Sequence, residues 1–318
     1  MRIAVIGAGA IGGFVAAALA RSGVAVGVVA RGAHLEAIRR NGLHVRSDLG
    51  SFDVRVEAAE DVRALGSFDA LVLAFKSHQW EPSLVQSLSD PRYSGATIVT
   101  LQNGVPFWYV RRPALQSVDP GGVLGSAFED ERIVGGVVHV SGRVEAPGSI
   151  VQSGGLRYVL GGVAATAQPR VAAIASIMRD AGLHAEVDDD IRAIAWLKLV
   201  NNVGLNSVST LEDASIRTML GNERQVAEVR RLMHETLDVG RAMGVVADAD
   251  IDARIAYAAR LDDVRTSMLQ DFRSDKPLEI DPMLGAVVEL AGRYDVDVPH
   301  VRAAYHQLQR LSAPASRD

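Results

Sequence analysis

The sequence contains no cysteine in its 318 residues. Disulfide bonds, a catalytic thiol and zinc held by cysteine are therefore excluded, and a chain without thiols fits a reducing cytoplasm. The eight histidines are scattered and form no HxH or HxxxH pair. Because histidine-rich metal sites commonly use such spacings, we expect no metal.

The sequence also lacks an excess of basic residues, with a formal net charge of -5. Neutralising many phosphates needs a dense basic patch, so we expect no nucleic-acid partner. Residues 3–20 carry no charge, and the length of this stretch raises the question of a signal peptide or a membrane span. Four glycines punctuate the stretch and only Arg2 precedes it, so we expect neither.

Hydrophobic residues make up 48% of the chain, enough for two hydrophobic cores at this length. Strand and helix patterns alternate up to a boundary near residues 188–190, after which almost only helical periodicity remains. We therefore predict an α/β Rossmann-type dinucleotide-binding domain over residues 1–188, followed by an all-α domain over residues 189–318.

The amino-terminal end carries a glycine motif in a defined setting. Residues 2–6 are typical of a buried strand, and a helix is predicted over residues 13–22, with a second strand over residues 25–30. The turn between the first two elements has the G-x-G-x-x-G spacing and consists of Gly7, Ala8, Gly9, Ala10, Ile11 and Gly12. The first glycine permits a tight turn, the second lets backbone amides approach a pyrophosphate, and the third lets the helix pack on the strand. A glycine-rich turn can exist without a ligand, but this setting predicts dinucleotide binding.

The end of the second predicted strand indicates the type of cofactor. NAD-binding folds usually place an acidic residue there to hold the ribose 2′-hydroxyl. Here Arg31 follows the strand, and no acid occurs before Glu36. The forked donors of an arginine can pair with a 2′-phosphate, which favours NADP(H). The alternative is an ordinary surface arginine.

Two further predicted strands end in polar residues. Residues 69–75 lead into Lys76, and residues 96–101 lead towards Asn103. Ligands of doubly wound sheets bind outside the carboxyl ends of the strands, so we expect both side chains near the nicotinamide and substrate. Because Asn103 precedes Gly104, a simple tight turn is the alternative.

The remaining elements are predicted from periodicity. Three short antiparallel strands, separated by glycines, are expected over residues 135–140, 144–151 and 157–161. A helix over residues 169–181 and a strand over residues 184–187 close the first domain. The second domain is predicted to hold helices over residues 191–206, with the pattern continuing to 211, and over residues 212–220, 223–243, 248–261, 282–294 and 299–311.

An unusual polar stripe lies on the first helix of the second half. Lys198, Asn202 and Asn206 are spaced i, i+4 and i+8, so their side chains project from one helical face. Such a face is too polar to pack against a core unless something polar meets it. A solvent face or a satisfied polar seam is the alternative.

Two later patches combine polar residues. Residues 266–271 are expected to form a polar connection between helices, and residues 278–281 directly precede a helix. Asp281 is suited to capping that helix. For Glu279, the alternatives are a solvent-facing side chain or a partner for Lys276.

Several of these pieces occur together in one known family. They are the fingerprint, Arg31, Lys76, LQNGV at residues 101–105, WLK at 196–198 with Asn202 and Asn206, SMLQD at 267–271 and EID at 279–281. Along nearly its full length the chain resembles the ketopantoate reductase (2-dehydropantoate 2-reductase) family, whose two-domain fold is 6-phosphogluconate-dehydrogenase-like. The lysine helix with SMLQD and EID is the specific part, because the fingerprint alone fits any Rossmann protein.

The resemblance implies NADPH-dependent reduction of ketopantoate to pantoate in the cytoplasm, a step towards pantothenate and coenzyme A. It implies that Lys198 donates a proton to the carbonyl oxygen, and that Glu279 assists this lysine and binds substrate. The groups holding the 2-oxo acid would be Asn103, Asn202, Asn206 and Ser267. Cofactor contacts would come from the fingerprint, Arg31, Lys76, Asn103 and Glu279. A small-molecule 2-oxo acid is thus the expected partner, and a homodimer stays open.

Elementary chemistry agrees with the role implied for Lys198. Hydride transfer to a carbonyl builds negative charge on its oxygen, and a positioned ammonium can stabilise and protonate that oxygen. Burial lowers the pKa of a lysine, while a nearby carboxylate raises it again, so a lysine and glutamate pair can tune the proton donor.

Two positions depart from the family pattern. Val264 stands where an asparagine is expected before Arg-x-Ser, and Leu284-Gly285 stands where an Asn-Gly pair is expected. If that asparagine touches the substrate, its loss changes which oxo acid is reduced rather than the type of reaction. The alternatives are therefore a reductase of another branched or aromatic 2-oxo acid and a non-catalytic NADP-sensing protein.

Overall fold

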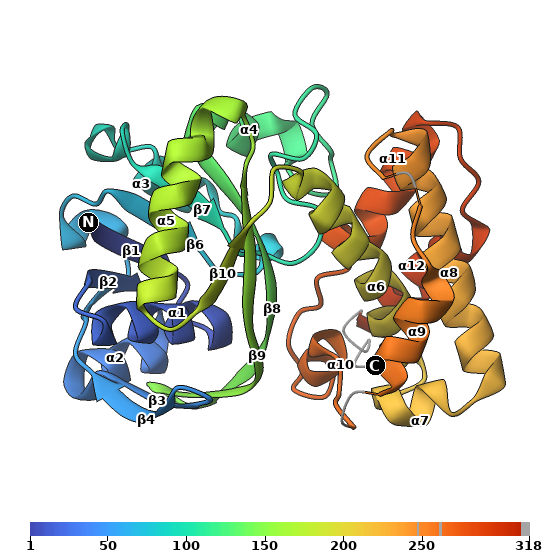
Figure 1. Ribbon diagram of the computed structural model, residues 1–318, viewed down its shortest axis with the longest axis horizontal. Coiled ribbons are helices and arrows are strands. Elements are labelled where there is room, and N and C mark those ends of the chain that lie inside the picture. Colours follow the sequence, from blue (N-terminus) through green and yellow to red (C-terminus); the bar gives the residue numbers. More distant parts are fainter. Residues whose placement is uncertain (247, 261–262, 313–318) are drawn as a thin grey trace, which may run out of the picture. The chain divides into compact units, whose positions relative to one another are not determined.

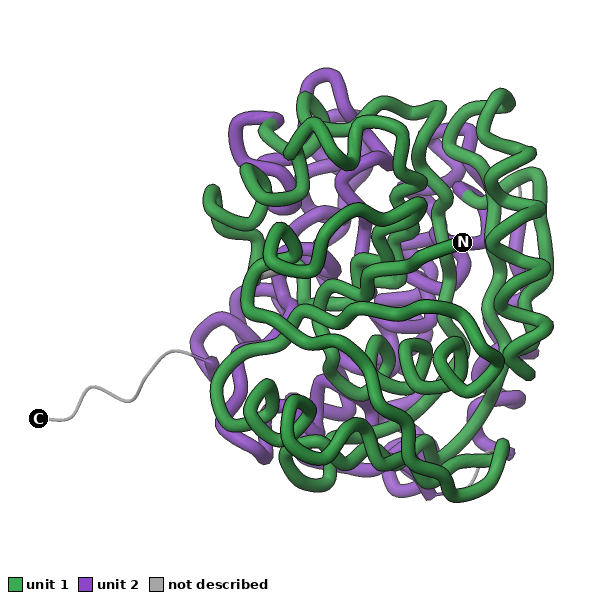
Figure 2. Tube along the Cα trace, turned by 90° about the vertical axis from the view of Figure 1, so that its left-hand side faces the viewer, with its two compact units in different colours: residues 1–102, 123–191 green, residues 103–122, 192–318 purple. Residues whose placement is uncertain are grey.

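The computed structural model describes residues 1–246, 248–260 and 263–312 (Figure 1). The chain divides into two compact units (Figure 2). Unit 1 comprises Met1–Gln102 and Val123–Ile191, and unit 2 comprises Asn103–Gly122 and Arg192–Asp318. The chain therefore leaves unit 1 at Asn103, returns to it at Val123, and leaves it again at Arg192. The sequence analysis did not predict this excursion into unit 2, because the change from alternating strands and helices to helices alone indicated only the boundary near residues 188–190.

The centre of unit 1 is a parallel sheet of short apolar strands. The predicted strands appear as β1 (Arg2–Ile6), β2 (Ala25–Val29), β6 (Ala70–Leu73) and β7 (Thr97–Thr100). They pair in parallel in the order β7-β6-β1-β2. Nearly all their residues are buried, as expected for strands covered on both faces. The order reverses direction around β1, which confirms the Rossmann-type architecture.

The later part of the sheet differs from the predicted short strands. β8 (Ile133–Ala146) and β9 (Ser149–Gly162) form one long antiparallel hairpin. The prediction of a strand over residues 144–151 is wrong, because Gly148 turns the hairpin there with a φ of +79°. The pairing shifts register three times, so internal glycines such as Gly142 lie in bulged strands instead of ending them. β10 (His184–Val187) forms as predicted and pairs in parallel with β9.

Helices and short strands complete unit 1. α1 (Ala10–Arg21) and α5 (Gln168–Asp180) bury apolar residues in one hydrophobic core with the sheet. The sequence analysis missed elements whose apolar pattern is short, namely α2 (Gly32–Asn41), β3 (Leu43–Ser47), β4 (Gly50–Val54), β5 (Glu57–Ala59), α3 (Pro82–Leu88) and α4 (Val123–Ala127).

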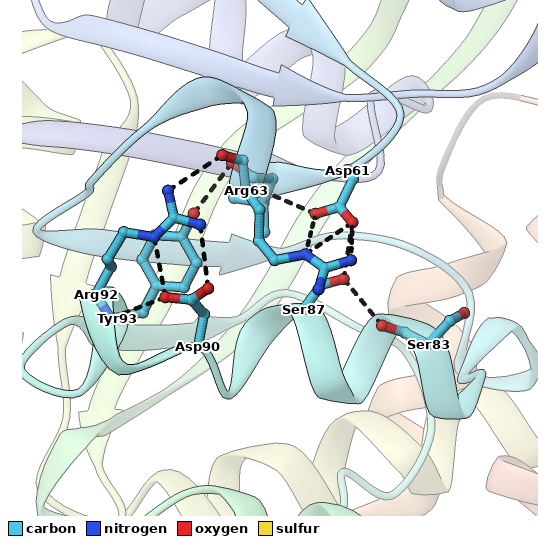
Figure 3. Close-up of polar contacts among 8 residues, drawn as sticks. Asp61, Arg63, Ser83, Ser87, Asp90, Arg92 and Tyr93 are labelled. Atoms are coloured by element: carbon cyan, nitrogen blue, oxygen red, sulfur yellow. Dashed lines mark hydrogen bonds and ion pairs between the residues drawn. The ribbon is translucent and has the colours of Figure 1, made fainter.

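Two exposed ion pairs cap two short 3-10 helices of unit 1 (Figure 3). Asp61 accepts the backbone N–H of Arg63 at 2.8 Å and also binds its guanidinium. Asp90 does the same for Arg92, with a backbone distance of 3.0 Å. The hydrogen bonds from the Arg92 side chain and backbone lower the pKa of Asp90 to about 2.

Unit 2 is helical apart from its connections. It contains α6 (Ile191–Leu211, beginning at the last residue of unit 1), α7 (Ile216–Leu220), α8 (Glu223–Ala242), α9 (Ile251–Ala259), α10 (Ser267–Phe272), a π-helical turn at Asp281–Gly285, α11 (Ala286–Arg293) and α12 (Pro299–Ser312). These helices confirm the predicted all-α second domain. None of the described helices combines the length and apolar character needed to cross a membrane.

Three helix predictions in unit 2 need correction. The helix predicted over residues 212–220 is interrupted, because Asp213 has a φ of +46° and Ser215 caps α7. The helix predicted over residues 248–261 starts later, where Asp250 caps α9, and Leu261 lies outside the described residues. Residues 266–271, predicted as a connection, belong to α10 (Ser267–Phe272) and its cap, because the Thr266 side chain accepts the N–H of Leu269.

Candidate active site

The glycine loop of unit 1 has the geometry that the fingerprint predicted. Gly7 has a φ of +96°, and a Cβ atom there would come within 2.8 Å of the Phe75 Cβ. A Cβ on Gly12 would lie 2.0 Å from the Gly7 carbonyl oxygen, so only glycine fits. A Cβ on Gly9 would face open space. The middle of the loop is thus open, while its two ends are closely packed.

Backbone hydrogen bonds fix this loop against the sheet. The N–H groups of Gly7 and Ala8 both donate to the Val29 carbonyl at 3.0 and 3.3 Å. Gly9 is the N-cap of α1 and supplies no side-chain cap, so the first N–H groups of α1 remain available to an outside acceptor. Free N–H groups at an open helix N-terminus fit a pyrophosphate.

His34 holds the same loop from another side, which the sequence analysis missed. The Gly148 N–H donates to the Nδ1 of His34 at 3.0 Å. The proton of a neutral imidazole therefore sits on Nε2, which lies 2.7 Å from the Ala8 carbonyl oxygen. A single histidine within a charged helix carries no sequence signal for this role.

Arg31 lies where the sequence analysis placed it, but it has an unexpected partner. It is the N-cap of α2, two residues after the end of β2, and its guanidinium lies 3.2 Å from the carboxylate of Glu81. Both side chains are about half exposed. The sequence has no acidic residue at the end of β2, but the fold brings Glu81 from a distant segment next to Arg31. Lys76 follows β6 and begins a 3-10 helix at the same edge of the sheet as the glycine loop.

In unit 2 the structure joins two predicted residues that are far apart in the sequence. The Lys198 Nζ donates to the Oδ1 of Asn103 at 2.8 Å. The turn at Asn103 is also real, because Gly104 has a φ of +80° and a Cβ there would lie 2.6 Å from the Pro282 carbonyl oxygen. That carbonyl accepts the Val105 N–H at 2.7 Å. Asn103 therefore takes part in a tight turn and also contacts Lys198, so the turn is not an alternative to a position in the site.

The environment of Lys198 changes its acidity. Burial lowers the pKa of Lys198 to about 8, and the negative charge of Glu279 opposes this shift. Glu279 is itself 9% exposed, so the solvent-facing interpretation is wrong. Asn103, Lys198 and Glu279 thus form one group drawn from three segments of unit 2, which we call the lysine site.

The other predicted side chains differ from one another in their exposure to solvent. Asn202 is partly buried, and Asn206 is only 6% exposed, with its Nδ2 lying 3.9 Å from the Met283 Sδ. A solvent face is therefore excluded for Asn206. Ser267 is exposed at the start of α10, and within the described part of the chain no hydrogen bond joins it to Lys198.

Asp281 does not cap the helix that follows it, so that prediction is wrong. Its Oδ1 accepts the Tyr305 hydroxyl at 2.7 Å, and Ile280 stands at the N-cap position without a side-chain bond. The π-helical turn widens the backbone here, and burial together with the Asp281 bond raises the pKa of Tyr305 to about 12.

The segment that carries Asn103 is anchored by an ion pair on α11. Glu289 accepts the N–H groups of Gln116 and Ser117, each at 3.0 Å. Arg293 pairs with Glu289 and donates to the carbonyls of Pro113 and Ala114. The sequence analysis missed this anchor, because an i, i+4 Glu and Arg pair on a helix is common on solvent faces.

The comparisons with known proteins cover nearly the whole length of the chain. The family model described as "Ketopantoate reductase PanE/ApbA" matches residues 3–165, and "Ketopantoate reductase PanE/ApbA C terminal" matches residues 190–312. A 2-dehydropantoate 2-reductase of Mesorhizobium japonicum is 38% identical and is covered to 98%, as is this chain.

Solved structures agree with the sequence relatives. A crystal structure from Ralstonia solanacearum MolK2, provisionally assigned as a ketopantoate reductase, has a TM-score of 0.91 at 34% identity and covers 98% of this chain and 97% of its own. D-Mandelate dehydrogenase with NADH and anilino(oxo)acetate has a TM-score of 0.86 at 19% identity over 98% of both chains, a likeness of fold alone. With both halves matched by the family models and a 38% identical relative along its length, the chain belongs to the ketopantoate reductase family of oxidoreductases.

Proposed function

We propose that the protein reduces ketopantoate to pantoate with NADPH, using Lys198 as the proton donor. The observation that carries this proposal is the lysine site, in which a partly buried ammonium donates to Asn103 and is influenced by Glu279. A bound nicotinamide cofactor would supply the hydride. The Lys198 ammonium would donate its proton to the substrate carbonyl oxygen, on which negative charge builds.

The other residues of the lysine site would prepare this transfer. Asn103 already holds the Nζ of Lys198 at 2.8 Å and so fixes its direction. Glu279 raises the pKa of Lys198 against the effect of burial and keeps more of it protonated near neutral pH. We propose that Asn202, Asn206 and Ser267 orient the oxygens of the 2-oxo acid, since carboxamides and hydroxyls do so without adding charge.

For the cofactor, we propose NADP(H) bound by residues 1–188. The open glycine loop fits the pyrophosphate, and the half-exposed guanidinium of Arg31 is available to a 2′-phosphate once it leaves Glu81. Lys76, Asn103 and Glu279 would complete the cofactor contacts. Residues 189–318, together with Asn103, would supply the substrate-binding and catalytic groups. The partner would be a small 2-oxo acid, and the location would be the cytoplasm.

A second candidate is the reduction of another branched or aromatic 2-oxo acid. Val264 favours it, because this apolar side chain is 44% exposed where the family pattern leads us to expect an asparagine. A non-catalytic NADP sensor is less well supported, since a sensor has no need of a paired lysine and glutamate.

The test is NADPH oxidation by the purified protein, followed by the loss of nicotinamide absorbance. Ketopantoate should be compared with a panel of branched and aromatic 2-oxo acids, with NADH as the control cofactor. Efficient turnover of ketopantoate with NADPH is the expected result. Turnover of a different oxo acid would favour the second candidate, and tight NADPH binding without any turnover would favour the sensor.

A further inference from the structure

One histidine of unit 1 bonds to two segments that are far apart in the sequence. His34 is partly buried on α2. Its Nε2, which carries the ring proton, lies 2.7 Å from the Ala8 carbonyl oxygen in the glycine loop. Its Nδ1 accepts the N–H of Gly148 at 3.0 Å. A neutral imidazole has one donor and one acceptor, so both nitrogens of the ring are in use.

The turn that holds this ring is itself fixed. Gly148 lies between β8 and β9, and a Cβ there would lie 3.2 Å from the Cβ of Ala37 on α2. The Gly148 carbonyl also accepts the N–H of His44 at 2.9 Å. The Gly148 N–H therefore sets the orientation of the imidazole, which then presents its Nε2–H to the Ala8 carbonyl.

The bond from His34 sets the direction of one peptide group in the glycine loop. The peptide bond between Ala8 and Gly9 is trans, so its C=O and N–H point in opposite directions. Because the Ala8 oxygen faces the imidazole, the Gly9 N–H faces away from it. Gly9 is exposed, and a Cβ there would meet nothing within 4 Å. No backbone carbonyl of the described residues accepts this N–H.

We propose that His34 is a positioning residue that holds the Ala8–Gly9 peptide so that the Gly9 N–H donates to the pyrophosphate of the nicotinamide cofactor; this inference rests on the proposed function. His34 acts through the Ala8 carbonyl and not by contact with the cofactor. A hydrogen bond to a charged oxygen depends on direction, and a donor fixed in advance loses less conformational freedom on binding. The alternative is that His34 only ties α2 to the turn between β8 and β9.

Two substitutions each keep one of the two hydrogen bonds. The amide of an asparagine ends near the position of Nδ1, so His34→Asn keeps an acceptor for Gly148 and loses the donor to Ala8. The amide nitrogen of a glutamine reaches about as far as Nε2, so His34→Gln keeps the donor and loses the acceptor. Both variants should lose similar stability, whereas only His34→Asn should release the Gly9 N–H from its direction. The matched control is His184→Asn, because His184 is an exposed histidine of the same unit on β10.

The experiment measures the dissociation constants of NADPH and NADH by calorimetry, with thermal unfolding and steady-state turnover in parallel. For His34→Asn we expect both cofactors to bind about 10-fold more weakly, as for a weakened hydrogen bond to a charged group, because both carry the pyrophosphate. The KM for NADPH should rise, while kcat at saturating cofactor should change little. His34→Gln should bind both cofactors nearly as tightly as the wild type, and the control should bind them normally.

Three results would overturn this inference alone. The first is normal binding of both cofactors by His34→Asn. The second is an equal loss of affinity in His34→Asn and His34→Gln, which would assign His34 to tying α2 to the turn. The third is a much larger loss for NADPH than for NADH, which would mean that His34 acts through Arg31, one turn earlier at the N-cap of α2.

The proposed function can fail separately from this inference. Wild-type protein that binds a nicotinamide cofactor but reduces no 2-oxo acid would contradict the proposed reaction, and the binding constants of the two His34 variants would still decide the role of His34. Wild-type protein that binds neither cofactor would contradict both.

Discussion

The glycine loop of unit 1 and the lysine site of unit 2 are built in opposite ways. The loop consists of six consecutive residues whose backbone makes the site, and its requirements are a positive φ and missing Cβ atoms. The lysine site consists of side chains from three segments, and Asn103 meets Lys198 across 95 positions of sequence. A site made by consecutive backbone can be found from spacing, whereas a site made by distant side chains needs the fold.

The two units also differ in the pKa of a charged side chain that each contains, Asp90 in unit 1 and Lys198 in unit 2. The partly exposed carboxylate of Asp90 has its pKa lowered to about 2 by Arg92, so it stays ionised at any ordinary pH and serves structure (Figure 3). Burial brings the pKa of Lys198 down to about 8, close to the pH at which enzymes work. Only a group whose pKa lies near the working pH can both hold and release a proton efficiently. This contrast supports the proposal that Lys198 is the proton donor.

The largest expected effect comes from removing the ammonium itself. Lys198→Ala should lower turnover by about 10²–10⁴-fold, the usual contribution of a positioned general acid. NADPH binding should survive, because the glycine loop and Arg31 belong to the other unit. Steady-state rates and cofactor titrations measure the two properties separately. If Lys198→Ala were as active as the wild type, Lys198 would not be the proton donor.

A backbone change can test whether the turn positions the lysine site. Gly104→Ala should reduce stability by about 1–3 kcal/mol and lower kcat about 10-fold or more, because its Cβ would meet the Pro282 carbonyl at a strained φ. Gly292→Ala is the matched control, since a Cβ there meets nothing within 4 Å. Thermal unfolding and kcat should be measured for both. Equal behaviour of the two variants would show that the turn does not position Asn103.

In unit 1, the charge of Arg31 should decide between the two nicotinamide cofactors. Arg31→Ala should weaken NADPH binding about 10–100-fold and NADH binding much less, because only NADPH carries the 2′-phosphate. Dissociation constants for both cofactors provide the measurement. The same loss for NADH as for NADPH would argue that Arg31 is merely a surface residue.

A pH profile tests the coupling of Glu279 to Lys198. Glu279→Gln removes the negative charge that raises the pKa of Lys198, so that pKa should fall and the reduction rate should decline at a lower pH than in the wild type. The profile of kcat/KM against pH reports this shift even if the variant is slower overall. An unchanged or upward shift would contradict the pairing.

The smallest expected effect concerns the unexpected partner of Arg31. Glu81→Gln should strengthen NADPH binding a few-fold, because the carboxylate at 3.2 Å competes with the phosphate and an exposed pair is weak. NADH binding should change little. The difference in NADPH affinity between this variant and the wild type should be smaller at high salt than at low salt, because salt screens the ion pair. Weaker NADPH binding in this variant would mean that Glu81 helps to hold the cofactor.

The sequence predicted the parts of this molecule that depend on local pattern. Gly7 and Gly12 meet local steric requirements, and the long apolar periodicity of α6 gave its full extent from Ile191 to Leu211. The partner of Arg31 was missed because Glu81 comes from another helix cap 50 residues away. Asp281 was misassigned because a π-helical turn and the Tyr305 hydroxyl replaced a simple cap. These outcomes follow from tertiary packing, which local propensity does not encode.

The central claim is that Lys198 is a protonated donor with a pKa of about 8. The most direct test is kcat/KM for ketopantoate reduction by the wild-type protein from neutral to alkaline pH, with NADPH binding followed in parallel. A donor must hold its proton, so the account predicts a tenfold fall per pH unit above about pH 8 while the cofactor still binds. A rate that stays constant well above that pH, with the protein folded and the cofactor bound, would contradict it.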